Sequence, residues 1–286
     1  MSGPRLDPFV VATELVAHAL RACPGEVALV ACYGSRAAGT GSPESDLDLY
    51  YVPVEGANPG LCRQFVLDGL PYDFWPVSWD FLEGIANATS SRPWSVAAGL
   101  VGQARLLYAR SEADRERFET LQARLKALTG PENRAAMRRR AAAAFGDVAA
   151  ALGWLELAEG PDELARAGAE LLNAACNCLG LLNQTAFTRG WGSNWPEVLA
   201  LPIIPPGLEA SAAVLLAGAD AQAARVTGAG LAREVRDLIR EPEASLPGEA
   251  PEAVFGGAYP FVVEYLSKVR SAAAAGDPNR ARLAAV

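Results

Sequence analysis

The chain has 286 residues, enough for two domains of ordinary size or for one large domain. Hydrophobic residues make up 51% of it and charged residues 20%, as in an ordinary globular protein, which excludes disorder, collagen-like repeats and a coiled coil as the main architecture. The 33 acidic residues outnumber the 25 basic ones, and the resulting net charge of −8 argues against binding to a nucleic-acid polymer.

Helical and strand patterns alternate over the first 130 residues. The apolar run 27–33 ends at a glycine, as a buried strand would, and 46–52 alternates polar and apolar residues with the period of a strand. The patterns predict a small mixed sheet with strands at 27–33, 46–52, 63–67, 72–77 and 104–108 and helices at 8–22, 79–86, 93–100 and 112–128.

After Pro131 every long segment has a helical pattern rich in alanine and leucine. The segments are 132–159, 162–189, 208–217, 220–240 and 259–275. We therefore expect an α/β (α+β) domain over residues 1–130 and an all-α helical-bundle domain over residues 131–286, which would bind an acceptor or form a dimer.

The cysteine and histidine content excludes two kinds of chemistry. The five cysteines include no CxxC pair, and the only histidine is His18, so a zinc knuckle and a histidine-based catalytic triad are both ruled out. No apolar run reaches the roughly 18 residues of a membrane span, and the N-terminus does not resemble a signal peptide. A cytoplasmic protein without membrane contact is expected.

A glycine and a serine follow the first predicted strand. Gly34 allows a close backbone approach, and the Ser35 hydroxyl can donate to a phosphate where the chain turns into a helix. Gly-Ser steps also occur in many ordinary turns. The step therefore becomes informative only through the carboxylates that follow it.

Three aspartates form a candidate metal site. Asp46 and Asp48 lie two residues apart in one predicted strand, so their carboxylates project from one face about 6–7 Å apart. Such a pair repels unless a cation neutralises it, and oxygen-only ligands suit Mg²⁺. Asp73 is the best-placed third carboxylate, ahead of Asp68 and Asp80, for a site with two ions about 3.5–4 Å apart. The competing interpretation of the pair is a solvent-facing strand edge.

The run from Gly34 to Leu49, G-S-x-x-x-G followed by S-D-x-D-L, together with Asp73, resembles the signature of the DNA-polymerase-β-like nucleotidyltransferases. The order of elements over residues 10–110 fits the same superfamily. An α/β domain followed by a helical domain also resembles the antibiotic nucleotidyltransferases of the kanamycin and lincosamide types.

These resemblances imply an enzyme that transfers a nucleoside monophosphate, with AMP from ATP expected, to a hydroxyl group of a small acceptor and releases pyrophosphate. Asp73 would also help to deprotonate the acceptor. The residues implied are Gly34 and Ser35 for the β- and γ-phosphates, Arg36 to neutralise phosphate charge, and Asp46, Asp48 and Asp73 for Mg²⁺.

A polar stripe runs along the predicted helix 162–189. Glu170, Asn173 and Asn177 fall on it at helical steps and are candidate acceptor contacts, with Glu170 as a possible second base. A plain solvated helix face has the same pattern. The acidic balance of the chain suits a cationic acceptor if the stripe does face the nucleotide.

Two other functions stay open at this point. The acceptor could be a macromolecule, as in protein AMPylation or an antitoxin of the minimal-nucleotidyltransferase kind, or the chain could be a non-catalytic nucleotide sensor. The complete pair of Asp46 and Asp48 argues against the sensor, which has little need for both carboxylates. RNA-tailing enzymes share the motif, but the acidic charge argues against them. A homodimer is compatible with all of these functions.

Overall fold

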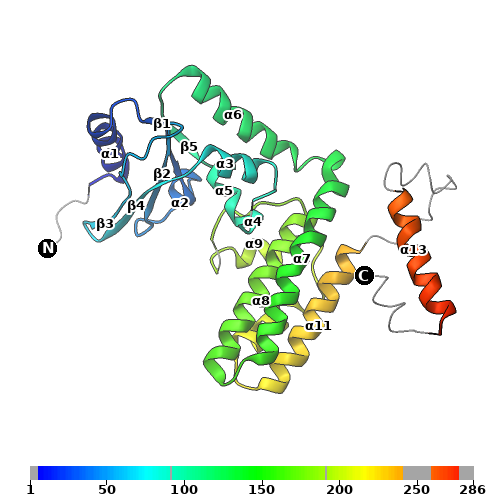
Figure 1. Ribbon diagram of the computed structural model, residues 1–286. Coiled ribbons are helices and arrows are strands. Elements are labelled where there is room, and N and C mark those ends of the chain that lie inside the picture. The colour runs from blue at the N-terminus through cyan, green and yellow to red at the C-terminus, as the bar shows by residue number, and fades with distance from the viewer. Residues whose placement is uncertain (1–5, 91, 191, 241–258, 277–286) are drawn as a thin grey trace. The chain divides into compact units, whose positions relative to one another are not determined.

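The computed structural model describes residues 6–90, 92–190, 192–240 and 259–276 (Figure 1). The chain divides into two compact units, Met1–Arg240 and Glu241–Val286, and each is considered by itself. In the second unit the structure describes helix α13 (Tyr259–Ala274), where we expected a helix over 259–275. No helix in the described ranges combines the length and the apolar character needed to cross a membrane.

A five-stranded sheet forms the N-terminal part of the first unit, with the strand order β3-β4-β2-β1-β5. Strands β2 and β4 are parallel and the other neighbours antiparallel, so the sheet is mixed, as predicted. The strands are β1 (Val27–Tyr33), β2 (Leu47–Pro53), β3 (Arg63–Leu67), β4 (Leu70–Pro76) and β5 (Arg105–Ala109).

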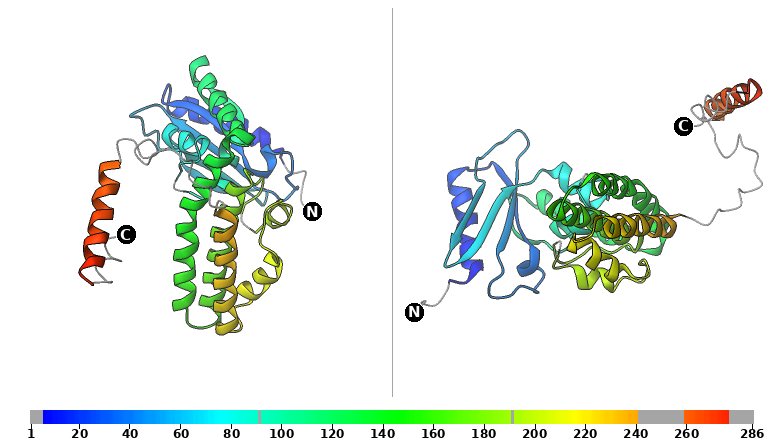
Figure 2. Two further views of the ribbon diagram at one scale, coloured as in Figure 1. Left: turned by 90° about the vertical axis from the view of Figure 1, so that its right-hand side faces the viewer. Right: turned by 90° about the horizontal axis from the view of Figure 1, so that it is seen from below.

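Helices cover both faces of this sheet (Figure 2). Helix α1 (Pro8–Ala22) lies on one face and packs its buried residues against side chains such as Leu47 and Leu49. Tyr50 and Val52 point to the opposite face and join the core formed with the later helices. Asp48 precedes Tyr50 by two residues, so it shares this second face. The second face is covered by α3 (Trp79–Ala86), α4 (Trp94–Ala97), α5 (Gly99–Gly102) and α6 (Glu112–Ala127).

The helical part begins after α6 with a short 3₁₀ turn, η1 (Pro131–Asn133). Its two longest helices lie side by side (Figure 1), and one continuous hydrophobic core joins them to the second face of the sheet. The predicted division into two domains near residue 130 stays a prediction. The helices are α7 (Arg134–Leu157), α8 (Pro161–Leu182), α9 (Trp195–Leu199), α10 (Leu208–Ala217) and α11 (Ala221–Ile239).

Two expected helices differ from the observed ones. The helix expected over 93–100 is divided into α4 and α5. The helix expected to reach residue 189 ends at Leu182, because Gln184 takes a left-handed backbone conformation (φ +53°) and the Thr185 N–H donates back to the Gly180 carbonyl (2.8 Å). Residues 183–190 therefore form a loop, and this loop reaches the candidate site.

Candidate active site

Three side chains lie in a row across the second face of the sheet. In the strand register Tyr33 of β1 is opposite Asp48 of β2, and Asp48 is opposite Asp73 of β4. Directly opposite residues share a face, so the row brings Asp73 beside Asp48 as the sequence predicted. Asp46, which we expected inside the strand, lies one residue before β2. The parallel pairing of β2 with β4 thus gathers the three candidate carboxylates.

The carboxylate of Asp48 is the electrostatic centre of this row. Burial, together with the negative charges of Asp46 and Asp73, raises its pKa to about 7. Within the described ranges, no three His, Cys, Asp or Glu side chains already stand close enough to enclose a metal ion. Mutual repulsion explains why carboxylates without a counter-charge do not converge. Their hard oxygen atoms are nonetheless the ligands that Mg²⁺ takes.

Aromatic side chains surround Asp48 on its face of the sheet. The Trp75 indole Nε1 donates to the Tyr33 hydroxyl (3.0 Å), and the two rings meet edge to face at 6.2 Å. Tyr50 is fully buried beside Tyr33, and its hydroxyl donates to the Leu100 carbonyl (2.8 Å). These rings lie on the same face as Asp48, and burial is the largest cause of the raised pKa of its carboxyl group.

Gly34 occupies a position that strongly favours glycine. Its φ of +75° belongs to the left-handed region, and a Cβ atom built on it would overlap the Oδ2 atom of Asp48. The next residue, Ser35, is the second residue of the four-residue helix α2 (Gly34–Ala37), and its carbonyl accepts from the Thr40 N–H (2.9 Å). The Ser35 hydroxyl makes no hydrogen bond to any described residue. It is therefore available to a ligand.

Arg36 has a different position from the one we expected. Its Nε donates to the carbonyl oxygens of Ser45 (2.8 Å) and Asp46 (3.0 Å), and its Nη2 reaches the Pro43 carbonyl (3.3 Å). These bonds hold the loop in front of β2, and the guanidinium does not line the cavity described next. Arg36 therefore braces the loop that carries Asp46, and its expected role toward a phosphate stays a prediction.

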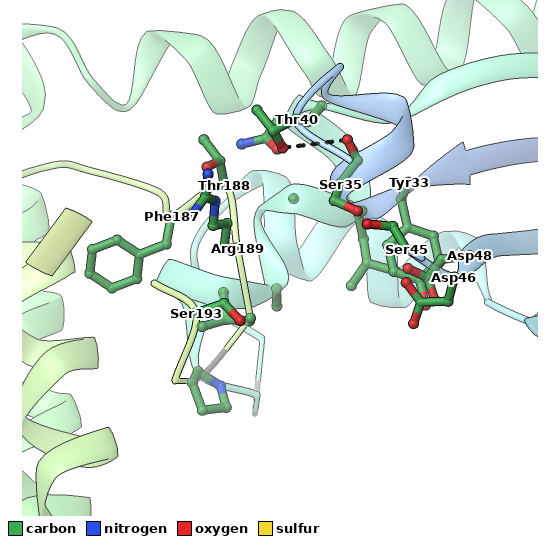
Figure 3. Close-up of a pocket in the computed structure, with 18 of the residues that line it drawn as sticks. Tyr33, Ser35, Thr40, Ser45, Asp46, Asp48, Phe187, Thr188, Arg189 and Ser193 are labelled. Atoms are coloured by element: carbon green, nitrogen blue, oxygen red, sulfur yellow. Dashed lines mark hydrogen bonds between the residues drawn. The ribbon is translucent and has the colours of Figure 1, made fainter. Parts of the chain in front are cut away.

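A cavity of about 890 Å³ opens beside the row of carboxylates (Figure 3). Asp46, Asp48 and Ser35 line one wall, whereas Asp73 lies behind Asp48 and is not part of the lining. Figure 3 shows the loop after α8 on the opposite wall. The sequence patterns did not single out several residues that line the cavity, among them Arg92, Gln103, Thr188 and Arg189.

The predicted acceptor stripe faces a second cavity instead. Glu170, Asn173 and Asn177 line a space of about 330 Å³, together with Asp147 and Trp154 of α7. Asn177 is only 6% exposed, and its Oδ1 accepts from the backbone N–H (3.2 Å) and the hydroxyl (3.1 Å) of Ser95. Asn177 thus ties α8 to α4, which is a structural contact. The two cavities share one lining residue among those described, Pro93.

Fold and site together define a nucleotidyltransferase of the DNA-polymerase-β-like kind: a small mixed sheet with a Gly-Ser turn and paired aspartates, followed by a helical part. Residues 115–243, from within α6 to just past α11, match the family model of the KNTase C-terminal domain, the C-terminal domain of kanamycin nucleotidyltransferase. This match supports a nucleotidyltransferase with a helical C-terminal part, as the sequence predicted.

A solved structure of a nucleotidyltransferase-like protein from Exiguobacterium sibiricum is 12% identical, with a TM-score of 0.38, and the match covers 88% of this chain and 78% of that one. A search of curated proteins finds no match. The assignment rests on the family match and on the site geometry.

Proposed function

We propose that this enzyme transfers a nucleoside monophosphate, with ATP as the expected donor, to a hydroxyl group of a small acceptor in a Mg²⁺-dependent reaction that releases pyrophosphate. The observation that carries this proposal is the position of Asp48, between Asp46 and Asp73 and on the wall of the larger cavity. The cavity volume of about 890 Å³ lies within the range of small-molecule sites.

The residues of the site divide the chemical work between them. Asp73, beside Asp48 in the strand register, helps to deprotonate the acceptor hydroxyl, whose oxygen then forms a bond to the α-phosphorus. The bond from that phosphorus to the bridging oxygen breaks, and pyrophosphate leaves with the electron pair. The Ser35 hydroxyl donates to a phosphate oxygen, and Asp46 and Asp48 hold Mg²⁺. Bound Mg²⁺ supplies the positive charge that neutralises the phosphates.

The second cavity supports a cationic acceptor. Its charged residues, Asp147 and Glu170, are both acidic, and the exposed ring of Trp154 offers a face for a cation. Pro93 lines both cavities, so the proposed acceptor is an elongated molecule that extends from one to the other. Glu170 and Asn173 keep their proposed acceptor role here, as binding groups at a distance from the reacting hydroxyl.

Turnover assays with labelled nucleotide test the proposal. The protein is incubated with ATP, Mg²⁺ and a panel of polyhydroxylated cations such as aminoglycosides, with lincosamides as less charged comparators, and pyrophosphate release is followed. Asp46→Asn and Asp48→Asn should each abolish turnover without lowering the thermal midpoint. Asp237→Asn is the matched control, because Asp237 is an exposed aspartate of α11 away from both cavities. Retained turnover in either site variant would contradict the proposal.

A further inference from the structure

The charges around the larger cavity have an unexpected distribution. Four charged residues among those described line it. Asp46 lies just before β2 and Asp48 lies in it, whereas Arg92 and Arg189 come from segments outside the sheet. Arg92 and Arg189 are exposed, and neither has a carboxylate within ion-pair distance in the part of the chain that the structure describes. The cavity therefore offers two guanidinium groups that no carboxylate among the described residues neutralises.

Hydrogen bonds join the two segments that carry these arginines. The Phe187 N–H donates to the Ser95 carbonyl (2.6 Å), which connects the loop after α8 with the start of α4. Phe187 is two residues before Arg189, and Ser95 is three residues after Arg92. The Asn177 amide, which accepts from Ser95, attaches the same point to α8. Both arginines thus lie within three residues of the hydrogen bond between Phe187 and Ser95.

The loop is braced on its other side as well. Thr188 donates its N–H (2.7 Å) and its hydroxyl (2.8 Å) to the two carboxylate oxygens of Glu197 in α9. Glu197 is therefore occupied next to Arg189 without forming an ion pair with it. The Arg92 guanidinium lies over the Phe81 ring, 5.8 Å from its centroid. These hydrogen bonds hold the backbone of the segments that carry the two arginines. The N–H donors of both guanidinium groups make no hydrogen bond to any described residue.

A triphosphate is the ligand chemistry that this arrangement fits. Arginine presents a planar set of N–H donors that bind phosphate oxygens in pairs, and a triphosphate carries enough charge to occupy two such groups. Arg36, the cation nearest to the Gly-Ser turn, is occupied by backbone carbonyls. The loop carrying Arg189 faces Ser35 across the cavity (Figure 3).

We propose that Arg92 and Arg189 bind the β- and γ-phosphates of the nucleotide donor and hold the pyrophosphate as it leaves. This inference rests on the proposed function, because it assigns the polyphosphate end of the same substrate. It predicts that the two arginines distinguish a nucleoside triphosphate from a monophosphate.

Calorimetric titrations of the full chain test this inference with three probes in the presence of Mg²⁺: ATP, AMP and inorganic tripolyphosphate. Removing both guanidinium groups in Arg92→Ala/Arg189→Ala should weaken ATP and tripolyphosphate binding roughly ten- to hundredfold, because charge-assisted hydrogen bonds are lost. AMP binding should stay within about twofold, since AMP lacks the β- and γ-phosphates. The single variant Arg189→Lys should recover part of the affinity that Arg189→Ala loses.

Arg233→Ala is the matched control, because Arg233 is an exposed arginine of α11 that lines neither cavity. It should bind all three probes as the wild type does. If the wild type binds ATP and the double variant binds it equally well while remaining folded by circular dichroism, the inference is wrong and the proposed function stands. If the wild type binds no nucleoside triphosphate with Mg²⁺, the proposed function fails as well.

Discussion

The Cα atom of Gly34 lies so close to the carboxylate of Asp48 that a Cβ atom added at this position would meet the Oδ2 atom. The contact follows from the strand register, because Tyr33, the residue before Gly34, pairs directly with Asp48. The phosphate-binding turn at the end of β1 and the candidate metal ligand in β2 therefore form one structural unit. A side chain added at Gly34 should therefore displace the carboxylate of Asp48.

Gly34→Ala should remove activity and destabilise the protein. The added methyl group meets Asp48 Oδ2, and alanine is also strained at a φ of +75°. We expect a loss of more than about 1 kcal/mol in the free energy of unfolding, measured by denaturant titration. Gly39→Ala is the matched control, because Gly39 has a similar φ of +73° but has nothing within 4 Å of its added Cβ. Equal losses of activity in the two variants would contradict the contact with Asp48.

Arg36→Ala should lower kcat and leave the affinity for ATP unchanged. The bonds from Arg36 to the carbonyls of Ser45 and Asp46 hold the loop that carries the Asp46 side chain. A displacement of about 1 Å at a reacting site can reduce turnover roughly a hundredfold. Arg36→Lys should restore little, because an ammonium group lacks the planar fork of donors. A loss of ATP affinity would instead assign Arg36 to a phosphate.

Asn177→Ala should reduce stability by about 1–3 kcal/mol, because it leaves the buried Ser95 N–H and hydroxyl without their acceptor. Glu170→Ala, at an exposed position on the same helix, should change stability by less than about 0.5 kcal/mol. Thermal and denaturant unfolding of both variants provide the measurement. An Asn177→Ala protein as stable as the wild type, with a raised KM for the acceptor, would restore Asn177 to the role of an acceptor contact.

The stability of the metal-free protein should fall as pH rises from about 4 to about 7. The pKa of Asp48 is about 7 in the folded protein and near 3.8 for an ordinary aspartate. Between these values the folded protein retains a proton that the unfolded chain has released, so each step up in pH favours unfolding. Denaturant unfolding at pH 5 and pH 8 in EDTA checks this.

Asp48→Asn should flatten that pH dependence, and Asp237→Asn should not alter it, because Asp237 is exposed on α11. Adding Mg²⁺ at pH 8 should raise the thermal midpoint of the wild type, and it should do so less in Asp48→Asn. An unchanged pH profile in Asp48→Asn would mean that other groups determine it.

Local sequence patterns determined the strands, most helix boundaries and the candidate carboxylates. The periods of two and of 3.6 residues depend on near neighbours in the chain, so the strand at 27–33 and the helix at 208–217 coincide with β1 and α10. Asp73 was also placed correctly beside Asp48, because a strand that follows a hairpin turn has few partners available.

Only the tertiary structure decided which other residues meet at the cavity. Arg189 enters because α8 stops at Leu182, where a left-handed Gln184 ends a run whose apolar pattern continues. Asn177 turned inward to Ser95, 82 residues away, and Arg36 turned toward backbone carbonyls. Such contacts depend on the packing of segments far apart in the chain, and short-range periodicity carries no information about them.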